Sequence, residues 1–150
     1  MLQTEPVARA QMLIRKPVAE VFEAFVNPEI TSRFWFSRGD SRLEEGKSVN
    51  WYWDMYGVSA EVTVKAIEEN KRILIEWPTP VEWIFSPRGD DATFVTIAAS
   101  GFEGTDDEKV DQALDAVGGF AIALCGCKAY LEHGVELNLV ADYNPDFNIT

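Results

Sequence analysis

The sequence predicts an α+β domain in which a curved antiparallel β-sheet of about six to seven strands packs against one long C-terminal helix. Two observations carry this prediction. Short segments of alternating apolar and polar residues follow one another over residues 41–100, and a helical spacing of apolar residues then continues from about 106 to 133. At 150 residues the chain has the length of one domain, so we expect residues 1–150 to form a single unit.

The first expected elements are a strand and two short helices. Val7–Ile14 is rich in β-branched and apolar residues and stops at a proline, Pro17, which favours a strand that ends there. Asn27-Pro28 interrupts the helix that follows, and Glu29–Phe34 is expected to form a second one. The first helix is predicted from apolar residues at helical spacing, namely Val18, Val21, Phe22, Phe25 and Val26.

The middle of the chain predicts a series of antiparallel strands. Val58–Ile67 alternates most regularly, with Ala60, Val62, Val64 and Ala66 expected on the inward face. Turn residues separate the other expected strands, which are Ser41–Leu43, Val49–Met55, Arg72–Trp77, Val81–Phe85 and Ala92–Ser100.

The last element is a long helix, expected over Asp106–His133. Thr105 and Glu108 have the spacing of a capping box, and Gly134 follows where a left-handed cap is favoured. Each glycine of Gly118-Gly119 lowers the stability of the helix by up to about 1 kcal/mol relative to alanine. This loss indicates a close approach, a bend or room for a ligand. The expected apolar stripe contains Val110, Leu114, Val117, Ala121, Leu124 and Leu131, widened by Phe120, Cys127 and Tyr130. Since one helix cannot cover so large a twisted sheet, we expect a cavity between them.

Composition excludes several classes of partner. Lys+Arg 13 against Asp+Glu 25 gives a formal net charge of -12, which disfavours nucleic acid and an anionic membrane surface. No run approaches the roughly 18 uninterrupted apolar residues of a membrane span, and Met1–Gln11 lacks the pattern of a signal peptide. Cys125 and Cys127 are expected to be free thiols of a reducing compartment. We therefore expect a cytoplasmic protein.

Large aromatic side chains are the main candidate for a site. The chain has five Trp, nine Phe and four Tyr residues, and they either fill a solid core or line an apolar pocket for a flat hydrophobic molecule. The residues expected to line such a pocket are Trp35, Trp51, Trp53, Met55, Trp77, Trp83, Phe120, Leu124 and Cys127.

Few residues suggest chemistry. If Asp54, Glu76 or Glu82 faced inward, it could act as a general acid or base, but each alternates with an inward tryptophan and is expected to face solvent. His133, the single histidine, is interpreted as a helix C-terminal residue. The cysteines lack an identifiable basic partner. No catalytic set, metal or cofactor is predicted.

Two further patterns have simpler explanations than a binding site. Asp106-Asp107-Glu108 and the pair Asp142 and Asp146 lack the spacing of a calcium loop, so a helix cap and a solvated tail are expected there. Arg-Gly-Asp occurs at Arg38–Asp40 and at Arg88–Asp90, where we interpret both copies as turns.

Several strings resemble a known superfamily. The order of elements is similar to the helix-grip superfamily called SRPBCC or START-like, and within it to domains related to the activator of the heat-shock-protein-90 ATPase. The matching strings are VAEVFEAFVNPEI from Val18 with Phe34-Trp35-Phe36, LEEGK from Leu43, ILIEW from Ile73, ATFVTI from Ala92 with Gly101-Phe102, GGF from Gly118 with Leu124, and KAYLEHG from Lys128. Ala98-Ala99 stands where relatives often carry a polar residue or histidine, which removes one polar group from the implied cavity.

This resemblance implies a fold more specifically than a function. Three functions are therefore left open. The first is binding of a small hydrophobic molecule, aromatic or lipid-like, between sheet and helix. The second is interaction with a chaperone, as for the activator's C-terminal domain. The third is a polyketide cyclase or aromatase, which needs a polar group of displaced pKa inside the pocket. The sequence does not indicate an oligomeric state.

Overall fold

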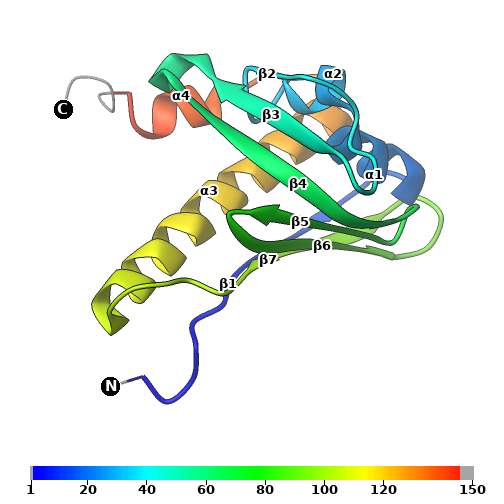
Figure 1. Ribbon diagram of the computed structural model, residues 1–150. Helices are drawn as coiled ribbons and strands as arrows, with labels where there is room; N and C mark the ends of the chain where they lie inside the picture. Colours follow the sequence, from blue (N-terminus) through cyan, green and yellow to red (C-terminus); the bar gives the residue numbers. More distant parts are fainter. Residues whose placement is uncertain (1, 146–150) are drawn as a thin grey trace.

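The computed structural model describes residues 2–145 and has the predicted α+β architecture (Figure 1). Seven antiparallel strands form one curled sheet, two short helices follow the first strand, and a long helix packs against the sheet. The elements are β1 Ala8–Ile14, α1 Val18–Val26, α2 Pro28–Thr31, β2 Arg38–Gly39, β3 Ser48–Trp53, the 3-10 turn η1 Asp54–Tyr56, β4 Val58–Glu68, β5 Arg72–Trp77, β6 Thr79–Pro87, β7 Thr93–Ala99, α3 Asp106–His133 and α4 Leu139–Tyr143.

The sheet has the strand order β1-β7-β6-β5-β4-β3-β2, so the chain's first strand closes one edge beside its last. All neighbouring pairs are antiparallel. Alternation holds as predicted in β3, where Val49, Trp51 and Trp53 are buried. In β4 it changes phase after Val64 because the pairing with β5 shifts there, so Ile67 instead of Ala66 packs against the core.

The long helix begins and ends where the sequence predicts. Thr105 Oγ1 accepts from the backbone N–H of Glu108 at 3.1 Å, while Glu108 Oε1 accepts from the N–H of Thr105 at 3.0 Å, which completes the capping box. Gly134 closes the other end at φ 67°, in the left-handed region.

Only the second half of α3 is a core helix. In Figure 1 its yellow N-terminal half extends past the sheet, and its orange end lies against the other elements. The predicted stripe is wrong at Val110 and Leu114, of which Leu114 is 67% exposed, and Ala113 is buried instead. Val117 packs against the core as predicted. The buried positions are Ala113, Phe120, Ala123, Leu124, Gly126 and Cys127.

A clamp of charged groups joins the C-terminal end of α3 to the end of β1. Glu132 Oε2 accepts from the backbone N–H of Arg15 at 2.8 Å and from Lys128 Nζ at 2.6 Å. Lys128 Nζ also donates to the carbonyl of Leu13 at 2.8 Å. Burial raises the pKa of the Glu132 carboxyl, but the hydrogen bonds from Arg15 and Lys128 outweigh it, so the pKa lies below its ordinary value.

Several boundaries differ from the prediction. The strand that pairs with β3 is Arg38–Gly39 and not Ser41–Leu43, because the N–H of Leu43 donates to the carbonyl of Val26 instead. The first Arg-Gly-Asp copy is thus partly a strand, and the second lies in the β6–β7 turn. The second helix ends at Thr31.

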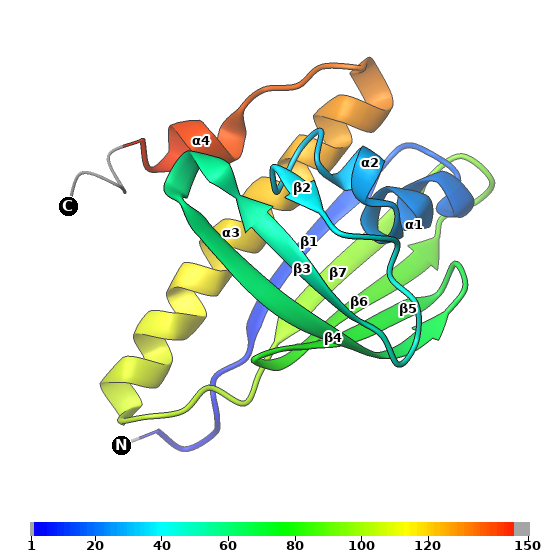
Figure 2. The ribbon, with the colours of Figure 1, turned by 45° about the horizontal axis from the view of Figure 1, so that its top comes forward.

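The tail contains a helix that the sequence analysis did not predict. Leu139–Tyr143 forms α4, so Asp142 lies on a helix, while Asp146 lies outside the described residues. Figure 2 shows α4 beside the tip of the β3–β4 hairpin. The hydroxyl of Tyr56 in that hairpin donates to the carbonyl of Val140, which fixes α4 there.

By length and composition alone, α3 meets the criteria for a helix that could cross a membrane. This helix contains no uninterrupted apolar run of that length, so the sequence did not predict it as a membrane span. A helix packed on a domain core passes the same test, so the criterion does not by itself indicate a membrane.

Candidate functional site: a tryptophan-lined cleft

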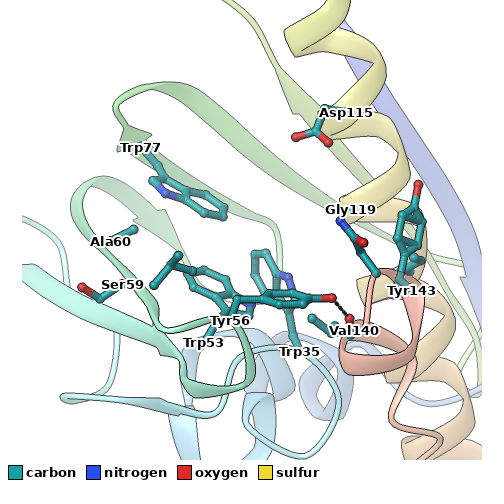
Figure 3. A pocket seen from close by; sticks show the side chains of 13 residues that line it. Trp35, Trp53, Tyr56, Ser59, Ala60, Trp77, Asp115, Gly119, Val140 and Tyr143 are labelled. Carbon is teal, nitrogen blue, oxygen red and sulfur yellow. Dashed lines mark hydrogen bonds between the residues drawn. The ribbon is translucent and has the colours of Figure 1, made fainter. Parts of the chain in front are cut away.

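A cleft of about 440 Å³ opens where the first half of α3 leaves the sheet (Figure 3). One side comes from the ends of β3 and β5 and the start of β4, the opposite side from α3, and the third from α4. Its volume lies within the roughly 300–1,000 Å³ of small-molecule sites. The lining residues are Trp35, Trp53, Tyr56, Val58, Ser59, Ala60, Trp77, Asp115, Gly119, Ile122, Val140, Tyr143 and Asn144.

Three indoles form the aromatic wall. Trp53 and Trp77 stack with centroids 5.5 Å apart and planes 8° from parallel. Strand β4 lies between their strands, and its small Ala60 leaves room for the two rings to meet above it. Trp35 packs edge-on against both, at 5.9 and 5.8 Å. Its own position follows from α2, because the N–H of Trp35 donates to the carbonyl of Thr31.

The wall rests on a solid aromatic core. Trp35 also contacts Trp51 at 5.3 Å, Trp83 at 6.2 Å and Phe120 at 6.5 Å between ring centroids. These contacts fix the plane of Trp35 from behind, since edge-to-face and tilted pairs of this spacing are favourable. The cleft is therefore lined by rings that the core already holds in place.

The nine residues predicted to line a pocket fall into three places. Trp35, Trp53 and Trp77 line the cleft. Met55 lies in η1, because β3 ends before it, and lines a separate hollow beside Ser37. The remaining five are buried in the core beneath the cleft, namely Trp51, Trp83, Phe120, Leu124 and Cys127. Some aromatic residues therefore fill a solid core and others line a cleft, which are the two alternatives that the sequence left open. The cleft is open to solvent, whereas an enclosed pocket was expected.

The helix side of the cleft depends on the glycine pair. A Cβ built on Gly119 meets nothing within 4 Å, so this position leaves the cleft empty. A Cβ on Gly118 would lie 2.8 Å from Tyr143 Oη, so that glycine lets α4 approach α3. Of the explanations that the sequence left open for the pair, the structure shows a close approach at one glycine and free space at the other.

Sequence reasoning missed the cleft residues of α3 and α4. Asp115 and Ile122 lie outside the predicted apolar stripe of the long helix, and no periodicity marks the five-residue α4. Signals that could have found them are the Gly118-Gly119 pair and the polar residue Asp115 one turn before it.

The carboxylates considered as acids or bases lie away from the cleft, Glu76 and Glu82 on the outer face of the sheet and Asp54 in the turn η1. Asp54 pairs with Arg38 at 3.3 Å, and Glu76 pairs with Lys65 at 3.7 Å. Glu82 accepts from Arg72 Nε. None of these carboxylates lines the cleft, in agreement with the solvent-facing interpretation.

The other candidate residues occupy structural positions. Cys127 is buried, and this burial raises the pKa of its thiol. The nearby negative charge of Glu132 raises the pKa further, so the reactive thiolate is disfavoured. Cys125 is an exposed free thiol. His133 is the last residue of α3. Within residues 2–145, no three His, Cys, Asp or Glu side chains group as metal ligands would.

Fold and cleft together define a helix-grip domain: a curled antiparallel sheet, a long C-terminal helix and a hollow between them. Residues 15–132 match the model of the family described as activator of Hsp90 ATPase homolog 1-like protein. The chain belongs to this family, as the resemblance indicated. No match was found among curated proteins.

Solved structures of other proteins share the fold of this chain. The protein SSP2350 from Staphylococcus saprophyticus is 32% identical, with a TM-score of 0.77 over 88% of this chain and 96% of its own. The Aha1 dimer from Colwellia psychrerythraea is 15% identical, with a TM-score of 0.74 over 86% of this chain and 98% of its own. DynU16, described as a putative protein in the dynemicin biosynthetic locus, is 20% identical, with a TM-score of 0.77 over 89% of this chain and only 49% of its own. The last two similarities show the fold alone.

Proposed function

We propose that this domain binds a small, flat hydrophobic molecule in the cleft, aromatic or lipid-like. One observation carries the proposal: three tryptophan rings face a hollow that no side chain of the described residues fills. Trp35 and Trp53 are each only 7% exposed and Trp77 is half-buried, so the rings are held in place while they keep some accessible apolar surface. Covering that surface with an apolar ligand is favourable. A bound aromatic ring would cover Trp53 and Trp77.

The glycine at position 119 supports the same proposal. Glycine weakens a helix interior by up to about 1 kcal/mol against alanine. No packing contact at Gly119 offsets this loss, because a Cβ there would meet only open space. A glycine at this position keeps the cleft open, because any larger side chain would take up part of its volume.

Filling the cleft from Gly119 tests the proposal. We expect 1-naphthylmethanol, a neutral probe, to bind the native chain in isothermal titration calorimetry, and Gly119→Leu to weaken that binding at least about tenfold, because the leucine side chain projects into the hollow. Cys125→Leu is the matched control, since Cys125 lies on α3, is exposed and does not line the cleft. Equal binding by both variants, or no binding by the native chain, would contradict the proposal.

A second function follows from the family and from a different surface. Val110 and Leu114 are exposed apolar residues on the half of α3 that extends past the sheet, a position suited to a protein contact. We infer chaperone interaction as the alternative function. Stimulation of a heat-shock-protein-90 ATPase by the native chain, lost in Leu114→Glu, would support it, and the absence of stimulation would count against it.

A further inference from the structure

We propose that the molecule bound in the cleft carries a positive charge next to its aromatic part, as a protonated or quaternary amine does, and that Asp115 faces the charged group. This inference rests on the proposed function, because it concerns the charge of the molecule that the same cleft would hold. Asp115 is the one formally charged residue among the described residues that line the cleft.

Asp115 lies on the wall of the cleft that α3 forms. In Figure 3 its carboxylate is on the α3 side of the hollow and turns toward the side formed by Trp77. Within the described part of the chain, the carboxylate of Asp115 makes no hydrogen bond and no salt bridge, unlike the carboxylates of Asp54, Glu76 and Glu82. Its oxygens are therefore available to a ligand.

The lining of the cleft contains no Lys, Arg or His in the described residues. Among the cations of nearby strands, Lys65 on β4 is paired with Glu76 and Arg38 on β2 is paired with Asp54. With a formal net charge of -12, the field of the whole chain also favours a cation over an anion.

The tryptophans favour a cation as well. A cation within about 6 Å of an indole face is attracted by the negative face of the ring, and tryptophan is the best of the aromatic residues for this contact. Trp53, Trp77 and Asp115 thus favour the same charge from opposite sides of one cleft. A neutral aromatic molecule would use only the indoles.

Three probes of one shape test the inference. They are (1-naphthylmethyl)trimethylammonium, 1-naphthylmethanol and 1-naphthylacetate, each titrated calorimetrically into the native chain at fixed ionic strength. We expect the cation to bind about fivefold more tightly than the neutral alcohol, and the anion to bind more weakly than both. Asp115→Asn keeps the size of the side chain and should bring the cation to within about twofold of the alcohol.

Asp111→Asn is the matched control. Asp111 is exposed one turn earlier on α3 and does not line the cleft, so its variant should keep the preference for the cation. Equal binding of cation and alcohol by the native chain, or a preference for the cation that is undiminished in Asp115→Asn, would overturn this inference and leave the proposed function standing. Failure of all three probes to bind would instead contradict the proposed function itself.

Discussion

Gly119 and Gly126 lie two turns apart on α3 and have opposite surroundings. A Cβ on Gly126 would lie 2.8 Å from the carbonyl oxygen of Phe34 and 3.1 Å from its Cβ, so this glycine lets α3 pack against the segment after α2. That segment carries Trp35, which makes Gly126 a determinant of where the aromatic wall stands. Gly119 has no neighbour to accommodate and instead leaves space in the cleft.

These surroundings predict opposite effects of the same substitution. Gly126→Ala should lower the free energy of unfolding by about 1–3 kcal/mol, because the backbone of Phe34 must shift. Gly119→Ala should raise it by up to about 1 kcal/mol, because alanine favours the helix and meets no atom. Urea unfolding followed by circular dichroism measures both free energies. A change of the same sign in the two variants would contradict the difference between the two glycine sites.

At the scale of elements, the clamp between α3 and β1 holds the core half of the helix. The Glu132 side chain is only 11% exposed and is bonded to both Arg15 and Lys128. Since the pKa of Glu132 is lowered on folding, its contribution is fully present above the unfolded value of about 4.3. It is lost as the pH falls through the folded value.

A pH series on Glu132→Gln checks this clamp. At pH 7 we expect the variant to be about 1–2 kcal/mol less stable than the native chain, since it loses charge-assisted hydrogen bonds. The difference should shrink as the pH falls below about 4, where native Glu132 also becomes protonated. Glu61→Gln, at an exposed strand position, is the control and should show little difference at either pH. A Glu132→Gln effect that stays constant between pH 7 and pH 3 would contradict the account.

Elements with strong local signals could be predicted from the sequence. The capping residues Thr105 and Glu108 and the cap at Gly134 give α3 its bounds, because they are bonded within a few residues along the chain. β2 and α4 depend on distant partners. β2 exists through its pairing with β3, and α4 is held by Tyr56, so no local pattern indicates either.

At the scale of the whole molecule, the cleft arises because α3 and the sheet diverge. The prediction that one helix cannot cover this sheet is confirmed by the position of the hollow, beside the half of α3 that leaves the sheet. Which aromatic residues line it could not be predicted. Alternation places Trp51 and Trp53 on the same face, but only their distance from the open end of the sheet separates a core residue from a lining residue.

The five indole N–H signals in a nitrogen-15 NMR spectrum test the central claim most directly, because each tryptophan reports separately on a bound ring. Adding 1-naphthylmethanol to the native chain should shift the signals of Trp35, Trp53 and Trp77, which line the cleft, much more than those of Trp51 and Trp83 in the core. Unchanged signals at saturating probe, or shifts confined to the two core indoles, would contradict a binding site in this cleft.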